Sequence, residues 1–109
     1  MAKLDCFYLL DNDGIPYVVK DLDEWGRGLF DQRRVAETIV GDARVSTVFL
    51  GLDHGCGDDP PVLFETMVFG GVHCGLMKRY TSLKAAKEGH ELFTQIVSGA
   101  LDVALGTMT

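Results

Sequence analysis

The sequence of 109 residues has no run of lysine or arginine, and its formal net charge at pH 7 is −6. Proteins that bind a nucleic-acid backbone gather cationic side chains on one face, because the phosphates supply much of the binding energy. We therefore expect no nucleic-acid partner. An acidic surface remains compatible with a protein partner that carries a basic groove, since complementary charge raises the rate of association.

Long apolar segments are also missing. No segment approaches the roughly twenty apolar residues that a membrane-spanning helix requires. The opening segment MAKLDCFYLLDND lacks the form of a signal peptide, because aspartates bracket too short an apolar run and no small-residue cleavage site follows. We expect a soluble, cytoplasmic protein without a membrane partner.

Cysteine is scarce and irregularly spaced. Cys6, Cys56 and Cys74 are an odd number without a CxxC pair, which favours reduced thiols over a disulfide framework. Neither His54-Gly-Cys56 nor His73-Cys74 has the spacing of a zinc module, so no metal site is predicted. No segment has the phosphate-loop form GxxxxGK[ST], and no cofactor is expected.

What the sequence does contain is a series of short strands and two helices, compatible with a single domain over residues 1–109. Asp21 followed by Glu24, and later Thr81 or Ser82, have the form of helix starts. Apolar, β-branched segments separated by turn residues predict the strands. The expected strands are 4–10, 15–20, 35–40, 44–52, 62–69 and 76–81, and the expected helices end near 32 and 97.

This element order, β-β-α-β-β-β-β-α, predicts an α+β fold. Hairpins joined by short turns favour one antiparallel sheet, with the two helices packed on one of its faces. The nearly uncharged tail, 98–109, is expected to extend the second helix, to pack on the core or to form a dimer contact.

The segment from Val45 to Gly71 is the most informative part of the chain. Two apolar strands bracket an acidic, glycine-rich loop, and both faces of the first strand are largely apolar. That strand is therefore predicted to be central and covered on both sides. Glu65 lies among apolar residues with the same facing, where burial without a partner costs several kcal/mol. It is either a ligand-binding carboxylate or a structural residue, which lies on a solvated sheet face or pairs with Arg44 or Arg79.

Other polar residues flank this segment. Asp53 and His54 follow the first strand, where they are either turn residues or a ligand-binding pair in which Asp53 orients the imidazole. Arg79 and Tyr80 precede the second helix, whose first N–H groups together with Arg79 are suited to a phosphate. His90 lies on the apolar face of that helix, as a hydrogen-bonded core residue or as a ligand-binding one.

The segments VSTVFLGLDH, PPVLFETMVFGG and RYTSLKAAKEGHE resemble a family of small, uncharacterised proteins encoded by phages and prophages. The resemblance covers most of residues 34–91. Carried over by position, the motif residues of that family are Thr47, Asp53, His54, Glu65, Thr66, Gly70, Gly71, Arg79, Tyr80, Gly89 and His90. Because small phage proteins without enzymatic motifs often act against host defences, the resemblance implies a counter-defence role in the cytoplasm of a bacterial host.

From these observations we expect a homo-oligomeric binding protein for a small polar ligand, a nucleotide-derived signalling molecule of host defence that the protein sequesters. The predicted ligand-binding residues are Thr47, Asp53, His54, Glu65, Thr66, Arg79, Tyr80 and His90. No catalytic residue is predicted, and an enzymatic activity is not the expectation.

Two alternatives remain open at this point. The first is an acidic, anti-CRISPR-like inhibitor that binds a host defence nuclease complex through a DNA-like charge array. That array would consist of Asp21, Asp23, Glu24, Asp58 and Asp59. The second is a small hydrolase with acid–base roles for Asp53, His54 and Glu65.

Overall fold

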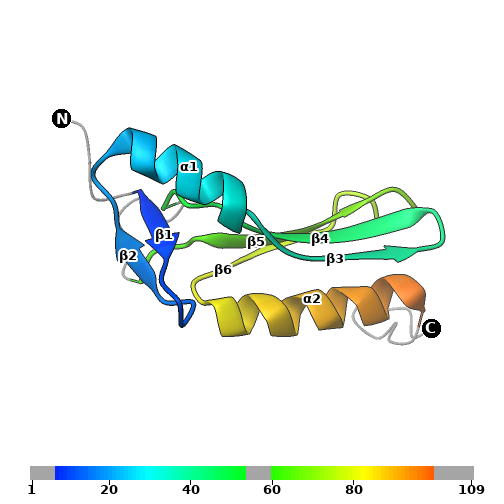
Figure 1. Cartoon of the computed structure of the whole chain (residues 1–109). Coiled ribbons are helices and arrows are strands. Elements are labelled where there is room, and N and C mark those ends of the chain that lie inside the picture. Colours follow the sequence, from blue (N-terminus) through cyan, green and yellow to red (C-terminus); the bar gives the residue numbers. More distant parts are fainter. Residues whose placement is uncertain (1–6, 54–59, 100–109) are drawn as a thin grey trace.

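A computed structural model of the chain describes residues 7–53 and 60–99. Its elements are β1 (Tyr8–Leu10), β2 (Pro16–Val18), α1 (Leu22–Gln32), β3 (Arg34–Val40), β4 (Ala43–Phe49), β5 (Phe64–Phe69), β6 (Met77–Tyr80) and α2 (Leu83–Ser98). The predicted α+β class and element order are confirmed (Figure 1). The strands form two antiparallel sheets, β1-β2 and β3-β4-β5-β6, where the sequence predicted one sheet with both helices on the same face.

Local sequence sets where both helices begin. Oδ1 of Asp21 accepts hydrogen bonds from the backbone N–H groups of Asp23 and Glu24, at 2.9 and 3.3 Å. Of the two residues predicted to cap α2, Ser82 does so, because its Oγ accepts from the N–H of Ala85 at 3.1 Å. These bonds satisfy N–H groups that have no partner within the helix.

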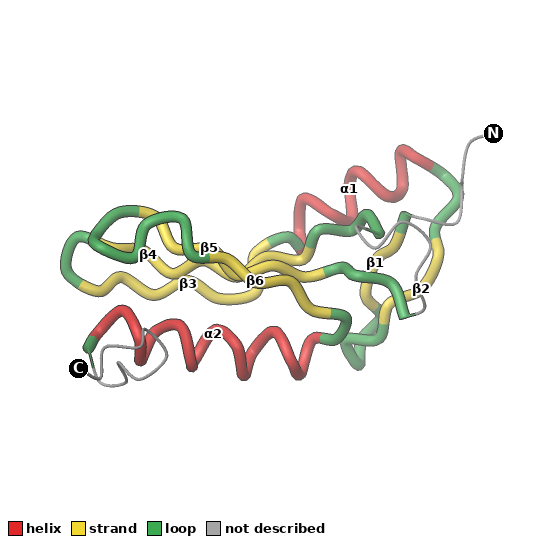
Figure 2. Tube along the Cα trace, turned by 180° about the vertical axis from the view of Figure 1, so that it is seen from behind, coloured by secondary structure: helices red, strands yellow, loops and turns green. Residues whose placement is uncertain are grey.

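Helix α1 packs on the two-stranded sheet at one end of the molecule. Nε1 of Trp25 donates to the backbone oxygens of Tyr8 and Gly51, at 3.1 and 3.0 Å. The side chain of Gln32 donates to the carbonyl of Leu10 at 2.7 Å and accepts from its N–H at 2.8 Å. These contacts hold the last turn of α1 beside the start of β3, on the opposite side of the four-stranded sheet from α2 (Figures 1 and 2).

Helix α2 covers the face of the four-stranded sheet that carries the buried side chains. In β4 the residues Ala43, Val45, Thr47 and Phe49 are buried, whereas Arg44, Ser46 and Val48 are partly exposed. Helix α2 packs against β3, β4, β5 and β6 on the buried side. The prediction that β4 is covered on both sides is therefore wrong. Period-two alternation places an arginine and a serine on the outer face, and such a face does not require a covering helix.

The core lies between α2 and the sheet and continues under α1. The aromatic rings of Phe49 and Phe64, both fully buried, pack with their centroids 5.3 Å apart. A second group of buried side chains packs near the other end of α2 and consists of Ala43, Val45, Val68 and Phe93. No helix among residues 7–53 and 60–99 is long and apolar enough to span a membrane.

Candidate functional site

The structure distributes the predicted site residues over both faces of the four-stranded sheet. The side facing α2 carries Thr47, Thr66 and Tyr80, and His90 of α2 packs against this side; all four residues are buried. The opposite side carries Glu65 and Arg79, which form an ion pair. Asp53 follows β4, and His54 lies outside the described residues, as do Cys6, Cys56, Asp58, Asp59 and the tail from residue 100.

The buried group is a chain of hydrogen bonds centred on His90. Nδ1 of His90 lies 2.7 Å from Oγ1 of Thr47, and Nε2 lies 2.9 Å from Oγ1 of Thr38. Oγ1 of Thr47 also bonds to Oγ1 of Thr66. A neutral imidazole has one donor and one acceptor nitrogen, and here both nitrogens have a partner. The interpretation of His90 as a hydrogen-bonded core residue is confirmed, and Thr38 is a member of the chain that the sequence did not indicate.

Tyr80 continues this group toward α2. Its hydroxyl lies against Gly89, where an added Cβ would stand only 2.0 Å from the phenolic oxygen. Burial raises the pKa of the Tyr80 phenol, and the neighbouring Thr66 hydroxyl partly offsets that rise. The contact with Thr66 falls short of hydrogen-bond geometry, which leaves the Tyr80 hydroxyl buried without a direct partner among the described residues. Gly89 is therefore present because α2 approaches the sheet closely here.

His90 makes the stability of the fold depend on pH. Burial lowers the pKa of its imidazole below the ordinary value of 6.5, an effect that the nearby Glu91 carboxylate only partly offsets. The unfolded chain therefore binds a proton at this residue at a higher pH than the folded chain does. The contribution of His90 to the free energy of unfolding is fully present above about pH 6.5. It falls as the pH drops from 6.5 toward the pKa of the folded state, by at most about 1.4 kcal/mol per pH unit.

The measurement is urea unfolding between pH 7.5 and 5.5, followed by circular dichroism. His90→Gln is expected to be less stable at pH 7.5 and to lose most of the pH dependence in this range. His73→Gln, which changes the other described histidine, is expected to keep the wild-type profile. A wild-type profile in His90→Gln would contradict the assignment.

The outer side of the four-stranded sheet, which we call the open face, is an ordered grid of side chains. Strand register places Val48, Glu65 and Arg79 in a row near α1. The middle row contains Glu37, Ser46, Met67 and Met77, and the row near the β3–β4 turn contains Ile39, Arg44 and Phe69. The open face thus mixes cations, carboxylates and apolar side chains.

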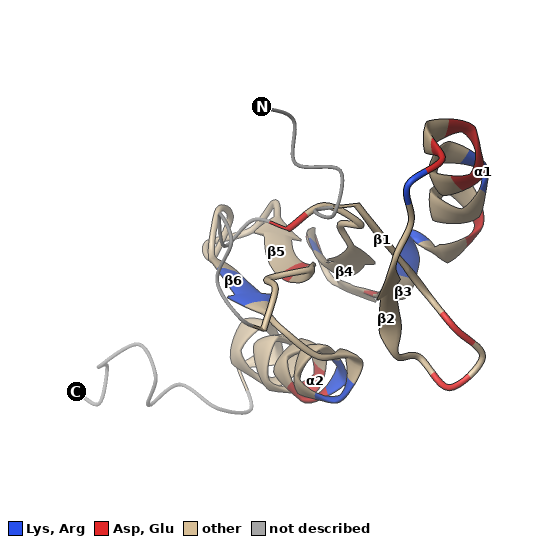
Figure 3. Ribbon diagram, turned by 90° about the vertical axis from the view of Figure 1, so that its left-hand side faces the viewer, with Lys and Arg blue, Asp and Glu red and all other residues tan. Residues whose placement is uncertain are grey.

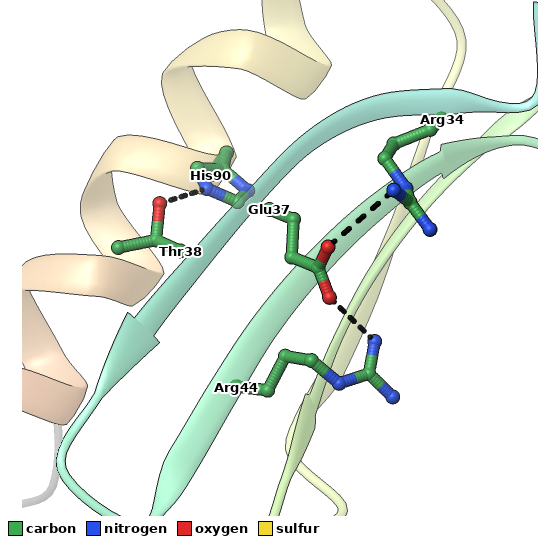
Figure 4. A network of polar contacts seen from close by, with 5 residues as sticks. All are labelled: Arg34, Glu37, Thr38, Arg44 and His90. Carbon is green, nitrogen blue, oxygen red and sulfur yellow. Dashed lines mark hydrogen bonds and ion pairs between the residues drawn. The ribbon is translucent and has the colours of Figure 1, made fainter.

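Glu37 forms ion pairs with two arginines on the open face (Figure 4). Glu37 lies between two arginines, with Oε2 3.2 Å from Nη1 of Arg44 and Oε1 3.7 Å from Nη1 of Arg34. The guanidinium of Arg44 also lies over the ring of Phe69, 4.4 Å from its centroid. These contacts fix the orientation of the Arg44 side chain. They use Nη1 for the ion pair, so the other N–H groups of the guanidinium lie on the open face as further donors.

A hollow of about 610 Å³ lies where the end of α1 meets the open face. Helix α1 and the residues after it contribute Phe30, Asp31, Arg33 and Arg34. The floor is formed by Arg44, Ser46, Val48, Glu65, Met67 and Phe69 of β4 and β5. Of the predicted site residues within 7–53 and 60–99, only Glu65 lines this hollow, and its carboxylate accepts a hydrogen bond from Nε of Arg79 at 3.0 Å.

Several lining residues were not singled out by the sequence. Arg44, Ser46 and Val48 lie on one face of β4 because side chains alternate along a strand. This alternation could have predicted from the sequence that the three residues share a surface. Phe30 gave a weaker signal, because it lies off the apolar stripe of α1 and is 86% exposed. That this helix ends beside the floor of the hollow depends on contacts between residues distant in sequence.

Asp53 has a structural contact. Its Oδ1 accepts a hydrogen bond from the N–H of Val62 at 3.0 Å. The acid–base set of a hydrolase would require Asp53 and Glu65 together, but Glu65 pairs with Arg79 on the open face. Within 7–53 and 60–99, no three His, Cys, Asp or Glu side chains gather as a metal site would require.

Comparisons with protein-family models, curated proteins and solved structures found no match. The resemblance to small phage proteins is thus a prediction from the sequence segments alone. Any functional conclusion depends on the geometry of the open face and of the buried hydrogen-bond chain.

Proposed function

We propose that this protein binds a small anionic ligand of the nucleotide class in the hollow between α1 and the open face. The observation that carries this proposal is the presence of three arginines, Arg33, Arg34 and Arg44, in the lining of one hollow, in a chain whose net charge is −6. Arginine is the side chain best suited to phosphate, because its planar guanidinium donates two parallel hydrogen bonds.

The size and the aromatic residues of the hollow support the same class of ligand. A volume of about 610 Å³ falls within the roughly 300–1,000 Å³ range of small-molecule sites. Phe30 at the rim is 86% exposed, and a flat base that stacks on such a ring gains about 1–3 kcal/mol. A phosphate beside the arginines and a base beside Phe30 would use both features of the site.

The buried hydrogen-bond chain around His90 supports the floor of the hollow from the side of the sheet that faces α2. Thr47 and Thr66 are on the same strands, β4 and β5, that supply the floor of the hollow. Their hydrogen bonds to each other and to His90 fix the strands against α2, and a rigid floor reduces the entropy lost on binding. In this proposal His90, Thr47 and Thr66 position the floor and do not touch the ligand.

The proposed biological role is sequestration, in which the protein lowers the free concentration of a nucleotide-derived defence signal without converting it. This role extends the resemblance to phage proteins and adds no further residue. It requires no catalytic group, in agreement with the pairing of Glu65 and the backbone contact of Asp53.

Isothermal titration calorimetry with a cyclic dinucleotide and a nucleoside triphosphate tests the binding proposal. We expect at least one probe to bind, and Arg44→Ala and Arg33→Ala each to weaken it about tenfold or more, since a charge-assisted hydrogen bond contributes about 1.5–3 kcal/mol. The corresponding nucleoside without phosphate is expected to bind much more weakly.

Lys87→Ala is the matched control, because Lys87 is an exposed cation outside the hollow. It is expected to leave the affinity unchanged. Absence of binding by every phosphate-bearing probe, or equal affinities in Arg44→Ala and Lys87→Ala, would refute the proposal.

The acidic inhibitor remains a second candidate, supported by the exposure of Asp23 and Glu24 in the first turn of α1 (Figure 3). Asp21 is partly committed to capping the helix, and Asp58 and Asp59 lie outside the described residues. A combined Asp23→Asn and Glu24→Gln variant separates the candidates, because it should abolish capture of a protein partner and leave nucleotide binding intact.

A further inference from the structure

We propose that the hollow selects guanine nucleotides, because the carboxylate of Glu65 in its lining accepts hydrogen bonds from the edge of the base. This inference rests on the proposed function, since it concerns the base of a ligand whose phosphate the arginines bind. It makes a separate claim, which is that the same nucleotide with adenine in place of guanine binds more weakly. The observation that carries it is a mostly buried carboxylate that lines the same hollow as three arginines.

Glu65 has a fixed orientation and unused acceptor sites. Its side chain is only 18% exposed, and its Oε2 accepts a hydrogen bond from Nε of Arg79 at 3.0 Å. Within 7–53 and 60–99, Arg79 is its one ion-pair and hydrogen-bond partner. The two oxygens of an ionised carboxylate offer about four acceptor sites, and buried acceptors are normally used. Glu65 is therefore held in place by Arg79 and can accept further hydrogen bonds from a ligand.

The cations of the hollow converge at a distance from this carboxylate. Nη1 of Arg44 and Nη1 of Arg34 lie 3.2 and 3.7 Å from the two carboxylate oxygens of Glu37 (Figure 4). Glu65 pairs in register with Val48, which is four residues from Arg44 along β4. At about 3.4 Å per residue, the backbone positions of Val48 and Arg44 are about 14 Å apart. A nucleotide has the same polarity, with phosphate at one end and a base at the other.

The aromatic residue of α1 belongs to the same end of the hollow as Glu65. Phe30 lines the hollow and is 86% exposed, and Glu65 lies in the row of the open face nearest α1. A base that stacks on Phe30 therefore has its polar edge in the part of the hollow that contains the carboxylate. Stacking accepts any base, because every base has a π-face, so Phe30 alone gives no selectivity.

The chemistry of a carboxylate supplies the selectivity. An ionised carboxylate only accepts hydrogen bonds. The Watson–Crick edge of guanine presents two adjacent donors, N1–H and the 2-amino group, which match the two oxygens. Adenine and cytosine place a ring-nitrogen acceptor beside their amino group, and uracil places its single N–H between two carbonyl oxygens. These bases would direct a lone pair at a carboxylate that is largely removed from water, which opposes their binding.

Isothermal titration calorimetry of the wild-type protein is the first test. Guanosine triphosphate is expected to bind about tenfold or more tightly than adenosine triphosphate, as a bidentate contact to a base edge gives. Inosine triphosphate, which lacks only the 2-amino group, is expected to fall between them. The cyclic dinucleotides of guanine and of adenine are compared in the same way. Equal affinities for the guanine and adenine forms would overturn the proposal.

Glu65→Gln assigns the selectivity to this carboxylate. The variant has nearly the same shape but replaces one acceptor oxygen by a donor, so it should lose most of the preference for guanine and still bind adenosine triphosphate. Glu37→Gln is the matched control, because Glu37 contacts Arg34 and Arg44 and is absent from the lining of the hollow. It is expected to change the affinities for both nucleotides by the same factor and to keep their ratio.

Asp31→Asn separates Glu65 from the other carboxylate in the lining. Asp31 is exposed, and its substitution should leave the preference for guanine in place. A preference that survives Glu65→Gln, or that disappears in Asp31→Asn, would overturn the role of Glu65.

The failure of this proposal is distinct from the failure of the proposed function. Equal binding of guanine and adenine nucleotides overturns the selection of the base and leaves the anion-binding site in place. Absence of binding by every phosphate-bearing probe overturns the proposed function, and the selection of the base with it.

Discussion

Gly89→Ala is expected to lower the free energy of unfolding by about 2 kcal/mol, although alanine is the better helix former. The added Cβ would stand 2.0 Å from the Tyr80 hydroxyl and 2.4 Å from its Cζ. Tyr80 is 7% exposed, so its rigid ring cannot turn away into solvent. Overpacking of this kind costs about 1–3 kcal/mol or more, which exceeds the gain of about 1 kcal/mol in helix propensity.

Gly26→Ala in α1 is the matched control for this prediction. Nothing lies within 4 Å of a Cβ added at Gly26, so the same substitution should stabilise the protein by about 0.5–1 kcal/mol. Urea unfolding of both variants at pH 7.5 measures the two changes. Equal effects of the same sign would show that α2 does not approach the sheet as closely as the structure indicates.

Thr47→Val is expected to lower the free energy of unfolding by about 2–3 kcal/mol with almost no change in side-chain volume. Oγ1 of Thr47 bonds to Nδ1 of His90 and to Oγ1 of Thr66, and the residue is fully buried. The substitution leaves a ring nitrogen and a hydroxyl without these bonds in the core. Each unsatisfied buried group costs about 1–3 kcal/mol, and a residual contact between Thr66 and Tyr80 limits the sum.

Ser46→Ala tests whether the lower stability of Thr47→Val comes from the buried hydrogen-bond chain around His90. Ser46 is the preceding residue on β4 but lies on the open face, so its substitution should change stability by about 0.5 kcal/mol or less. The imidazole signals of His90 in NMR spectra should shift in Thr47→Val and remain in place in Ser46→Ala. A stable Thr47→Val variant with unchanged His90 signals would contradict the described network.

The sequence anticipated several elements of the fold for identifiable local reasons. Helix α1 begins at Asp21 because a carboxylate followed by good helix formers satisfies the first N–H groups. The pairing of Glu65 was anticipated in part, since Arg79 was one of the two arginines considered as its partner. Gly89 lies in the middle of an otherwise regular helix, and an interior glycine of this kind is a sequence feature compatible with close approach to a neighbouring element.

The sequence could not show how polar residues divide between the two sides of the sheet. Thr66 and Glu65 are neighbours in β5, yet one belongs to the buried chain and the other to the open face. Alternation predicts that neighbours face opposite ways, but it does not say which side receives the helix. The hollow itself needed the end of α1 beside β4 and β5, a contact set by Gln32 and Leu10.

What the sequence determined by itself is the set of elements, because caps, turns and alternation act over a few residues. The tertiary structure alone decided the site. It separated His90, Thr47, Thr66 and Tyr80 from Glu65 and Arg79, and it brought Arg33, Arg34 and Arg44 together from the α1–β3 junction and β4. Strand register and helix packing involve residues far apart in the chain, and the buried imidazole of His90 has its hydrogen-bond partners on such distant residues.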